Sequence, residues 1–389
     1  MLRLVLAVLA IVILIPGCLT ALHLGTMALA SIFFHAPKHR DDAPSVRFLV
    51  VIPAHNEELL LGHTLEAINA AKRPGDQVLV VDDRSIDHTS DIARAHGAEV
   101  LRREPGEEPG RAPARQAAIR HSRSLEWDAM VMIDADSVIN PAFFDECEQA
   151  MASGAVALQA RSEAAAGRRL VDQAALASFA IQGVTLPRGR EVLGLPVRLR
   201  GTGMVLRRDL LQQLDFRAKA SEDLQVSLDL VQEGVRTRHV ERARMRSANA
   251  DSWQVASTQK QRYEAGRMAA AREFVPKLLR CRSRAGFEAA WFLVSPPFAS
   301  AAGLLAIGTA LALLARSAVV AWIGVGSLAA LLFAFLVAAV QARVGWRVIA
   351  ALAAAPFFIG WKLLIQLKAM LGLRGGLKEF GPTDRHSTS

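Results

Sequence analysis

The chain has 389 residues, of which 52% are hydrophobic and 21% are charged, and its formal net charge is +9. It is too apolar for an ordinary soluble protein and too charged for a bundle made only of membrane helices, so we expect one soluble domain joined to a membrane part. Nucleic acid is not an expected partner, because the sequence has no recognised nucleic-acid-binding module and a single tyrosine for stacking. Basic residues beside membrane segments explain the positive charge better.

The first predicted element is an almost wholly apolar segment, residues 1–34, which is long enough to cross a bilayer. A cleaved signal sequence is the alternative, because residues 15–18 read Ile-Pro-Gly-Cys. Apolar residues continue well past Cys18, and a proline before the glycine is unusual at a cleavage site, so we favour an uncleaved anchor. A polar linker, residues 35–45, follows it.

From residue 46 to residue 256, short apolar runs alternate with helical segments. The predicted strands are 48–53, 77–81, 98–101, 129–133 and 155–159, and the predicted helices between them are 57–72, 87–96, 111–123 and 141–152. This alternation predicts an α/β domain with a mostly parallel sheet that is covered on both faces. Ligands of such sheets bind at the carboxyl ends of the strands.

Two pairs of acidic residues lie at predicted strand ends. Asp134 and Asp136 follow an apolar run, and residues i and i+2 of an extended chain point to the same side, so we expect their carboxylates to converge. Two hard oxygen ligands at one point suit Mg²⁺ or Mn²⁺, although the acids can instead cap a turn and the next helix. Asp82 and Asp83 can accept hydrogen bonds from a base or a ribose hydroxyl.

The second half of the chain is less regular up to residue 241. It contains a glycine turn at 201–203, a short strand at 204–206 and a helix at about 222–233. Residues 257–286 are strongly basic, and they predict amphipathic interface helices that lie on a membrane surface.

The following segment, residues 287–367, is membranous. Residues 287–314 and 318–340 predict a transmembrane hairpin, and residues 348–365 form a third apolar stretch that contains Pro356, Gly360 and Lys362. A third full span would place the basic tail, residues 368–389, outside the cell, so we expect the third stretch to be re-entrant or interfacial.

Several short motifs occur in a fixed order between residues 47 and 267. They are Pro53…Asn56-Glu57, Asp82-Asp83-Arg-Ser85, Asp134-Ala-Asp136, Gly201-Thr-Gly203, Ser221-Glu222-Asp223 and Gln259-Lys-Gln-Arg262-Tyr263. Together they resemble the nucleotide-sugar half of family 2 glycosyltransferases, which have the GT-A fold. The hairpin after them is similar to the membrane-bound cellulose- and hyaluronan-synthase-like branch, whose Q-x-x-R-W element has Tyr263 in place of tryptophan here.

The resemblance implies a role for each motif. Asp223 would be the general base, and the adjacent Glu222 would raise its pKa; the alternative is that both are ordinary acids in a first helical turn. A divalent metal would be held by Asp136 and Asp134. The nucleotide sugar would contact Pro53, Asn56, Glu57, Asp82, Asp83 and Asp134, and the acceptor or diphosphate would contact Gly203, Gln259, Arg262 and Tyr263.

The expected function is therefore that of a multi-pass inner-membrane enzyme with a cytosolic catalytic domain. It would transfer sugar with inversion from a nucleotide sugar, a UDP sugar first of all, to a membrane-associated glycan or lipid. A growing polysaccharide and a single lipid remain open as acceptors; few hydrophobic segments are available for a polysaccharide channel, so a polymer would require a homo-oligomer or an export partner. A non-catalytic nucleotide-sugar-binding scaffold is the alternative of another class, and a scaffold would not need Asp223.

Overall fold

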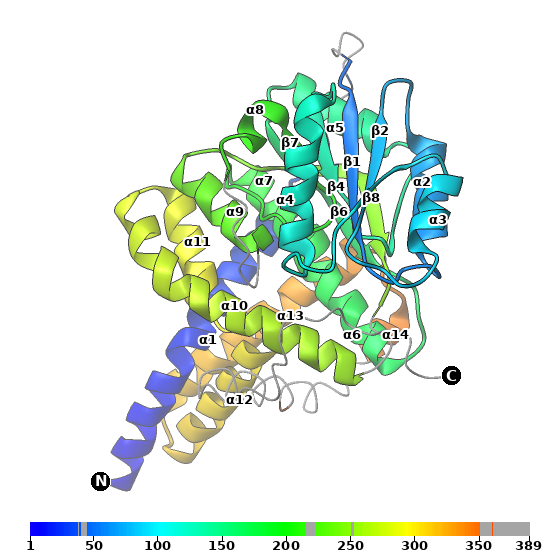
Figure 1. Cartoon of the computed structure of the whole chain (residues 1–389). Coiled ribbons are helices and arrows are strands. Elements are labelled where there is room, and N and C mark those ends of the chain that lie inside the picture. Colours follow the sequence, from blue (N-terminus) through cyan, green and yellow to red (C-terminus); the bar gives the residue numbers. More distant parts are fainter. Residues whose placement is uncertain (38, 40–44, 215–221, 250–252, 351–359, 361–389) are drawn as a thin grey trace.

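The computed structural model describes residues 1–37, 39, 45–214, 222–249, 253–350 and 360 (Figure 1). An α/β domain with a large sheet lies at one end, and a group of long helices that includes the N-terminal helix α1 (Leu2–Ile32) lies at the other (Figure 1). The expected division into a domain of alternating strands and helices and an apolar helical part is thus visible in the described residues.

The sheet has eight strands in the order β3-β2-β1-β4-β7-β6-β8-β5. Four of its strand pairs are parallel and three, β4·β7, β6·β7 and β5·β8, are antiparallel. The predicted mostly parallel sheet is therefore confirmed, with antiparallel pairs in one half. The bounds are β1 Phe48–Ala54, β2 Gln77–Asp82, β3 Glu99–Arg102, β4 Ala129–Met132, β5 Ser137–Ile139, β6 Ala157–Ala164, β7 Met204–Arg207 and β8 Arg238–Ser247.

Strand β1 shows why the apolar runs form central strands. Phe48, Val50 and Ile52 are buried in the core on one face of the sheet, and Leu49 and Val51 are buried in the core on the other face. Both faces are covered, because α2 (Leu61–Ala71), α3 (Thr89–Ala95) and α5 (Phe143–Ala152) supply the first core, and α4 (Arg111–His121), α8 (Arg208–Leu211) and α9 (Glu222–Gln232) supply the second.

Strand β8 was not predicted, because its charged sequence does not look like a buried strand. Its buried Glu241 pairs with Arg161 of β6 and with Arg188, so that the charges are satisfied inside the protein. Strand β5 was also missed, because it is only three residues long. The region that the sequence showed as irregular contains three helical elements. They are α6 (Leu170–Phe179), the π-helix η2 (Ala180–Thr185) and α7 (Leu186–Val192).

The predicted first arm of the membrane hairpin, residues 287–314, is not one helix. It is divided between α11 (Arg284–Val294) and α12 (Phe298–Leu314), which are bent by 70°. Pro296 and Pro297 lack backbone donors, and Arg267 donates to the carbonyl oxygens of Phe292, Leu293 and Ser295. The guanidinium thus satisfies the end of α11 at the break.

Within the described chain, α1 and α13 (Ala318–Gln341) are long and apolar enough to cross a membrane, and the bent pair is a third candidate if it forms one span. Helices α1, α12 and α13 pack at glycines; a Cβ added to Gly308 would lie 2.6 Å from Leu14 Cγ, and one added to Gly324 would lie 2.1 Å from Thr309 Oγ1. A short helix, α14 (Trp346–Ala350), follows. Most of the predicted third stretch, 348–365, and the whole basic tail, 368–389, lie outside the described residues.

Helix α9 joins the two parts of the molecule. Its buried Leu224, Leu228 and Val231 pack against Phe274 and Leu278 of α10 (Trp253–Arg280) and against α11. The basic segment predicted to form interface helices is thus largely helical, and one face of α10 packs on protein. The N-terminus of α9 carries Glu222 and Asp223, so α10 and α11 are in contact with the helix that positions these two acids.

Candidate active site

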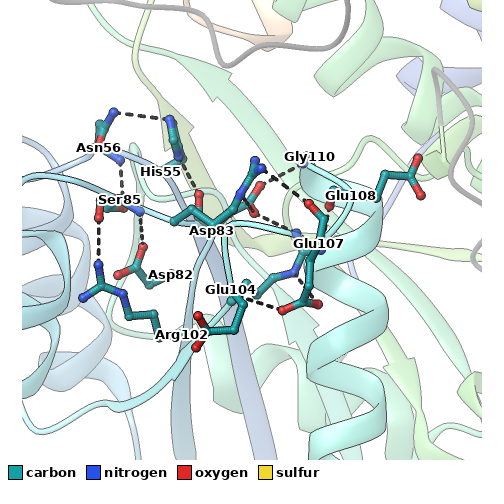
Figure 2. Close-up of polar contacts among 12 residues, drawn as sticks. His55, Asn56, Asp82, Asp83, Ser85, Arg102, Glu104, Glu107, Glu108 and Gly110 are labelled. Atoms are coloured by element: carbon teal, nitrogen blue, oxygen red, sulfur yellow. Dashed lines mark hydrogen bonds and ion pairs between the residues drawn. The ribbon is translucent and has the colours of Figure 1, made fainter.

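The loops after β1 and β2 form one hydrogen-bonded unit (Figure 2). The buried Asp82 accepts hydrogen bonds from Ser85 N, at 2.7 Å, and from the Ser90 hydroxyl. Asn56 has a positive φ of 53°, its N–H donates to Ser85 Oγ, and its side-chain oxygen accepts from Ile86 N. Asp82 therefore holds the loop, while Asn56 connects the two strand ends.

Asp83 connects this unit to helix α4 (Figure 2). Its carboxylate accepts hydrogen bonds from Arg103 Nη1 at 2.7 Å and from Gly110 N at 2.8 Å, directly before α4. The predicted nucleotide contacts Asp82 and Asp83 are therefore both buried and engaged by protein donors. Pro53 is half-buried at the end of β1, and Glu57 donates its N–H to Thr89 Oγ1.

A second cluster lies at the end of β4. The strand ends at Met132; Asp134 follows it outside regular structure, and Asp136 lies in the turn before β5, so the strand on which their convergence was predicted stops short of both. They nevertheless share a neighbour, Arg111 of α4, whose Nη1 is 3.0 Å from Asp134 Oδ2. Asp134 above all, and also Asp136, Glu222 and Glu57, raise the pKa of Arg111. Acids from three predicted motifs thus stabilise the positive charge of one guanidinium, that of Arg111.

Arg115, one turn further along α4, is the centre of this cluster. Its side chain is fully buried, and it bonds to Glu222 Oε1, to the Gly201 carbonyl and, at 3.5 Å, to Asp134 Oδ1. One residue therefore fixes the β4 turn, the glycine turn and the start of α9 relative to one another.

Asp223 lies next to this bridge. It is half-buried, its Oδ1 accepts from Leu224 N, and a Cβ added to Gly201 would be 3.4 Å from its Oδ2. Burial raises the pKa of Asp223, and the neighbouring charge of Glu222 raises it further. A carboxylate with this environment is suited to accept a proton.

The glycine turn is held by the sheet. Gly203 has a φ of 69°, its N–H donates to Met132 O, and its carbonyl accepts from Ala160 N. A Cβ there would lie 3.2 Å from that of Ala160. The glycine is thus explained by its conformation and close packing, and its backbone groups are used inside the protein; the predicted diphosphate contact at Gly203 has no free N–H.

The predicted acceptor motif lies on α10. Gln259 and Tyr263 are exposed, and Arg262 is half-buried. The Tyr263 side chain lies near the guanidinium groups of Arg198 and Arg200, and Arg200 also interacts with Asp223. The motif on α10 is therefore linked to Asp223 through Arg200.

The residues that the sequence did not indicate are mainly arginines. Arg111 and Arg115 are four residues apart at the start of a helix, so they share a face, and that spacing was the available signal. Gln159 of β6, which accepts from Arg200 N and donates to Thr202 O, holds the glycine turn. Nothing in its local sequence distinguishes it from a buried strand residue.

Comparison with known proteins assigns this part of the chain to a family. The model of the family described as "Glycosyltransferase like family 2" matches residues 44–266, more than half of the chain. The chain belongs to this family. The matched residues, 44–266, include every predicted site residue from Pro53 to Tyr263.

A solved structure with the same fold is mannosyltransferase PcManGT from Pyrobaculum calidifontis, in complex with GDP-Man and Mn²⁺. The likeness has a TM-score of 0.54 at 18% identity and covers 86% of this chain and 98% of that one. This family 2 chain is also 35% identical over 88 residues to 4,4'-diaponeurosporenoate glycosyltransferase of Staphylococcus aureus (strain USA300), which is 21% of this chain. The match spans 23% of the length of that curated relative.

Proposed function

We propose that the protein transfers a sugar with inversion from a nucleotide sugar, a UDP sugar first of all, to a lipid acceptor in the membrane. The observation that supports it most is the position of Asp223, a carboxylate of raised pKa beside the acidic cluster, on the helix that packs against α10 and α11. Family membership supplies the reaction class.

The acidic cluster fits a divalent metal. The pKa of Arg111 is raised by four carboxylates, those of Asp134, Asp136, Glu222 and Glu57, and Asp223 lies close to this group. The carboxylates therefore outnumber the two guanidiniums, those of Arg111 and Arg115. An anionic diphosphate would not enter an excess of negative charge unless a cation accompanied it. Among the described residues no group of three or more His, Cys, Asp or Glu side chains could hold a metal alone.

Mg²⁺ commonly takes one or two carboxylates and completes its shell with substrate phosphates and water. Asp136 and Asp134 would hold the ion, and Arg111 would have to release Asp134. The bound ion would neutralise charge on the leaving diphosphate. The residues of the chain then have two tasks: Asp223 removes the acceptor hydroxyl proton, and Arg115 keeps Asp223 and Asp134 in register.

Removal of the metal is expected to stop the reaction. Excess chelator should abolish transfer, and added Mn²⁺ or Mg²⁺ should restore it. Asp136→Asn, which keeps the size but removes the charge, should raise the metal concentration needed for half-maximal rate by about tenfold or more. Asp145→Asn, which makes the same change at an exposed carboxylate of α5, is the control. Full turnover in excess chelator would contradict the assignment.

The acid limb of the pH–rate profile tests the base. Asp223 works only when deprotonated, so transfer should fall as the pH drops through its folded pKa, which burial and Glu222 raise. Glu222→Gln removes one negative neighbour, so it should lower that pKa and move the acid limb to lower pH. Rates at saturating donor, measured for both proteins, check this. If the acid limb of the pH–rate profile is the same in both proteins, a group other than Asp223 controls it.

A lipid acceptor is favoured over a growing polymer by the membrane helices. Only two or three candidate spans are present in the described chain, and α1, α12 and α13 contact one another closely at glycines. The test is incubation of membranes that contain the protein with a panel of labelled nucleotide sugars and Mn²⁺, followed by separation of lipid from polymer. A labelled polymer would favour the synthase-like branch, with a homo-oligomer or an export partner forming the channel.

Orientation in the inner membrane is testable by cysteine labelling. Nucleotide sugars are cytosolic, so α10 and the catalytic domain should face the cytosol, and the turn between α12 and α13 should face the other side. Single cysteines at Ser257 and at Ser317, in a background without Cys18, Cys147 and Cys281, should react with an impermeant reagent from opposite sides. Reaction of both from one side would exclude a spanning α11–α12 pair.

A further inference from the structure

Two arginines, Arg198 and Arg200, lie beside the helices α10 and α11 that pack against α9. Leu199 is buried in the sheet core, whereas Arg198 and Arg200 both lie near Tyr263 of α10. The Arg198 guanidinium carbon is 3.3 Å from the ring centroid of Phe292 on α11, and that of Arg200 is 5.0 Å from the ring of Phe179 on α6. The segment thus presents two cations on the side of the site that faces α6, α10 and α11.

Arg198 and Arg200 are half-buried, and they differ from the buried arginines of the domain. Arg115 pairs with Glu222, Arg161 with Glu241 and Arg190 with Glu288. Within the part of the chain that the structure describes, neither Arg198 nor Arg200 forms an ion pair, and the buried Arg198 Nε has no hydrogen-bond partner. The acid near Arg198, Glu288, is engaged by Arg190.

An unpaired guanidinium in such a place is costly. Burial lowers the pKa of both side chains, and Arg190 adds to this effect at Arg198, but arginine does not lose its proton in proteins. The aromatic rings offset part of the cost, because a cation is attracted to their faces. They do not satisfy the N–H donors, which an oxyanion would satisfy in a fork geometry.

We propose that Arg198 and Arg200 bind the anionic headgroup of the acceptor, a phosphate or carboxylate on a membrane lipid that also carries the hydroxyl to be glycosylated. The inference rests on the proposed function, and it names the class of acceptor. The donor diphosphate would lie near Arg111 and Asp134, where the metal is proposed to bind. Arg200 interacts with Asp223, so the hydroxyl next to an anion bound there would lie near the proposed base.

The chemistry balances with this placement. The hydroxyl oxygen of the lipid forms a bond to the anomeric carbon while the bond from that carbon to the diphosphate oxygen breaks. The nucleoside diphosphate leaves with the electron pair, and the hydroxyl proton passes to the Asp223 carboxylate. The headgroup anion is unchanged, so it serves only to select and position the acceptor.

The test compares an anionic lipid with a neutral one, and each of them carries a free hydroxyl. Dioctanoyl phosphatidylglycerol and dioctanoylglycerol are titrated into the detergent-solubilised full-length protein without donor, and binding is measured by calorimetry. Wild type should bind the anionic lipid about tenfold tighter or more, because charge-assisted hydrogen bonds to arginine form only with the phosphate. Arg198→Gln/Arg200→Gln should lose this preference, and Arg198→Lys/Arg200→Lys should keep part of it.

Controls separate the alternatives. Arg94→Gln removes an exposed arginine of α3 and should change nothing. A preference absent from wild type, or unchanged in the glutamine variant, would overturn the inference. So would a selective loss of UDP affinity, which would place the arginines at the donor, or inorganic phosphate that binds as tightly as the lipid. Transfer assays with the same lipids test the proposed function separately: binding without transfer contradicts that function, and equal transfer to both lipids contradicts only the anion site.

Discussion

Asp223→Asn is expected to leave donor binding nearly intact and to lower the transfer rate by about a hundredfold or more, the usual effect of a lost general base. Asparagine has the same shape, and its side-chain oxygen can still accept from Leu224 N, so α9 should begin as before. Its amide cannot take up the acceptor proton. Calorimetry with the nucleotide sugar and a transfer assay on the same preparation separate binding from chemistry.

The matched control is Asp229→Asn, which makes the same change on the same helix away from its N-terminus. It should retain the wild-type rate. If Asp223→Asn instead abolishes donor affinity, Asp223 is part of the donor site, and another group must act as the base. If the rate is unchanged in both variants, transfer does not depend on a carboxylate at the start of α9.

The fold was predictable where apolar runs alone determine an element. The runs at β1, β2 and β4 have to be central strands, because both faces of each are buried. Strand β8 could not be recognised, because its Glu241 becomes compatible with burial only when Arg161 and Arg188, distant in sequence, are beside it. The break before α12 depends likewise on Arg267, which supplies donors from another helix.

The candidate site, too, was predictable where local sequence determines a position and unpredictable where distant residues do. The acids were predicted because they stand at strand and helix ends, and the structure brings Asp134, Glu222 and Asp223 together. Their mutual arrangement was not predictable, because it depends on Arg115, whose partners lie 19 and 107 residues away in sequence. Asp82 and Asp83 were interpreted as ligand contacts from position alone. Their buried hydrogen bonds to protein donors became visible only in three dimensions.

Arg115→Met is expected to destabilise the domain and inactivate it together. Arg115 is fully buried, and removal of one member of a buried ion pair typically costs about 3–5 kcal/mol, because the other charge remains without compensation. The Glu222 and Asp134 side chains are each 14% exposed, so some solvation remains, and we expect the lower end of that range. Denaturant unfolding of the solubilised protein measures the change in the free energy of unfolding.

Arg111→Met is the matched comparison, because it removes the same kind of side chain from the same helix and the same partner, Asp134. The Arg111 side chain is 56% exposed, so its ion pair is solvated and its loss should change the free energy of unfolding by about 0–1 kcal/mol. The two variants thus distinguish a structural bridge from a surface charge. Equal effects on stability would mean that Arg115 does not hold the β4 turn, the glycine turn and α9 together. If only Arg115→Met lowers the stability, the Arg115 guanidinium holds Asp134 and the start of α9 at their spacing. Neither a bound metal nor a substrate is then needed to set the distance between Asp134 and Asp223.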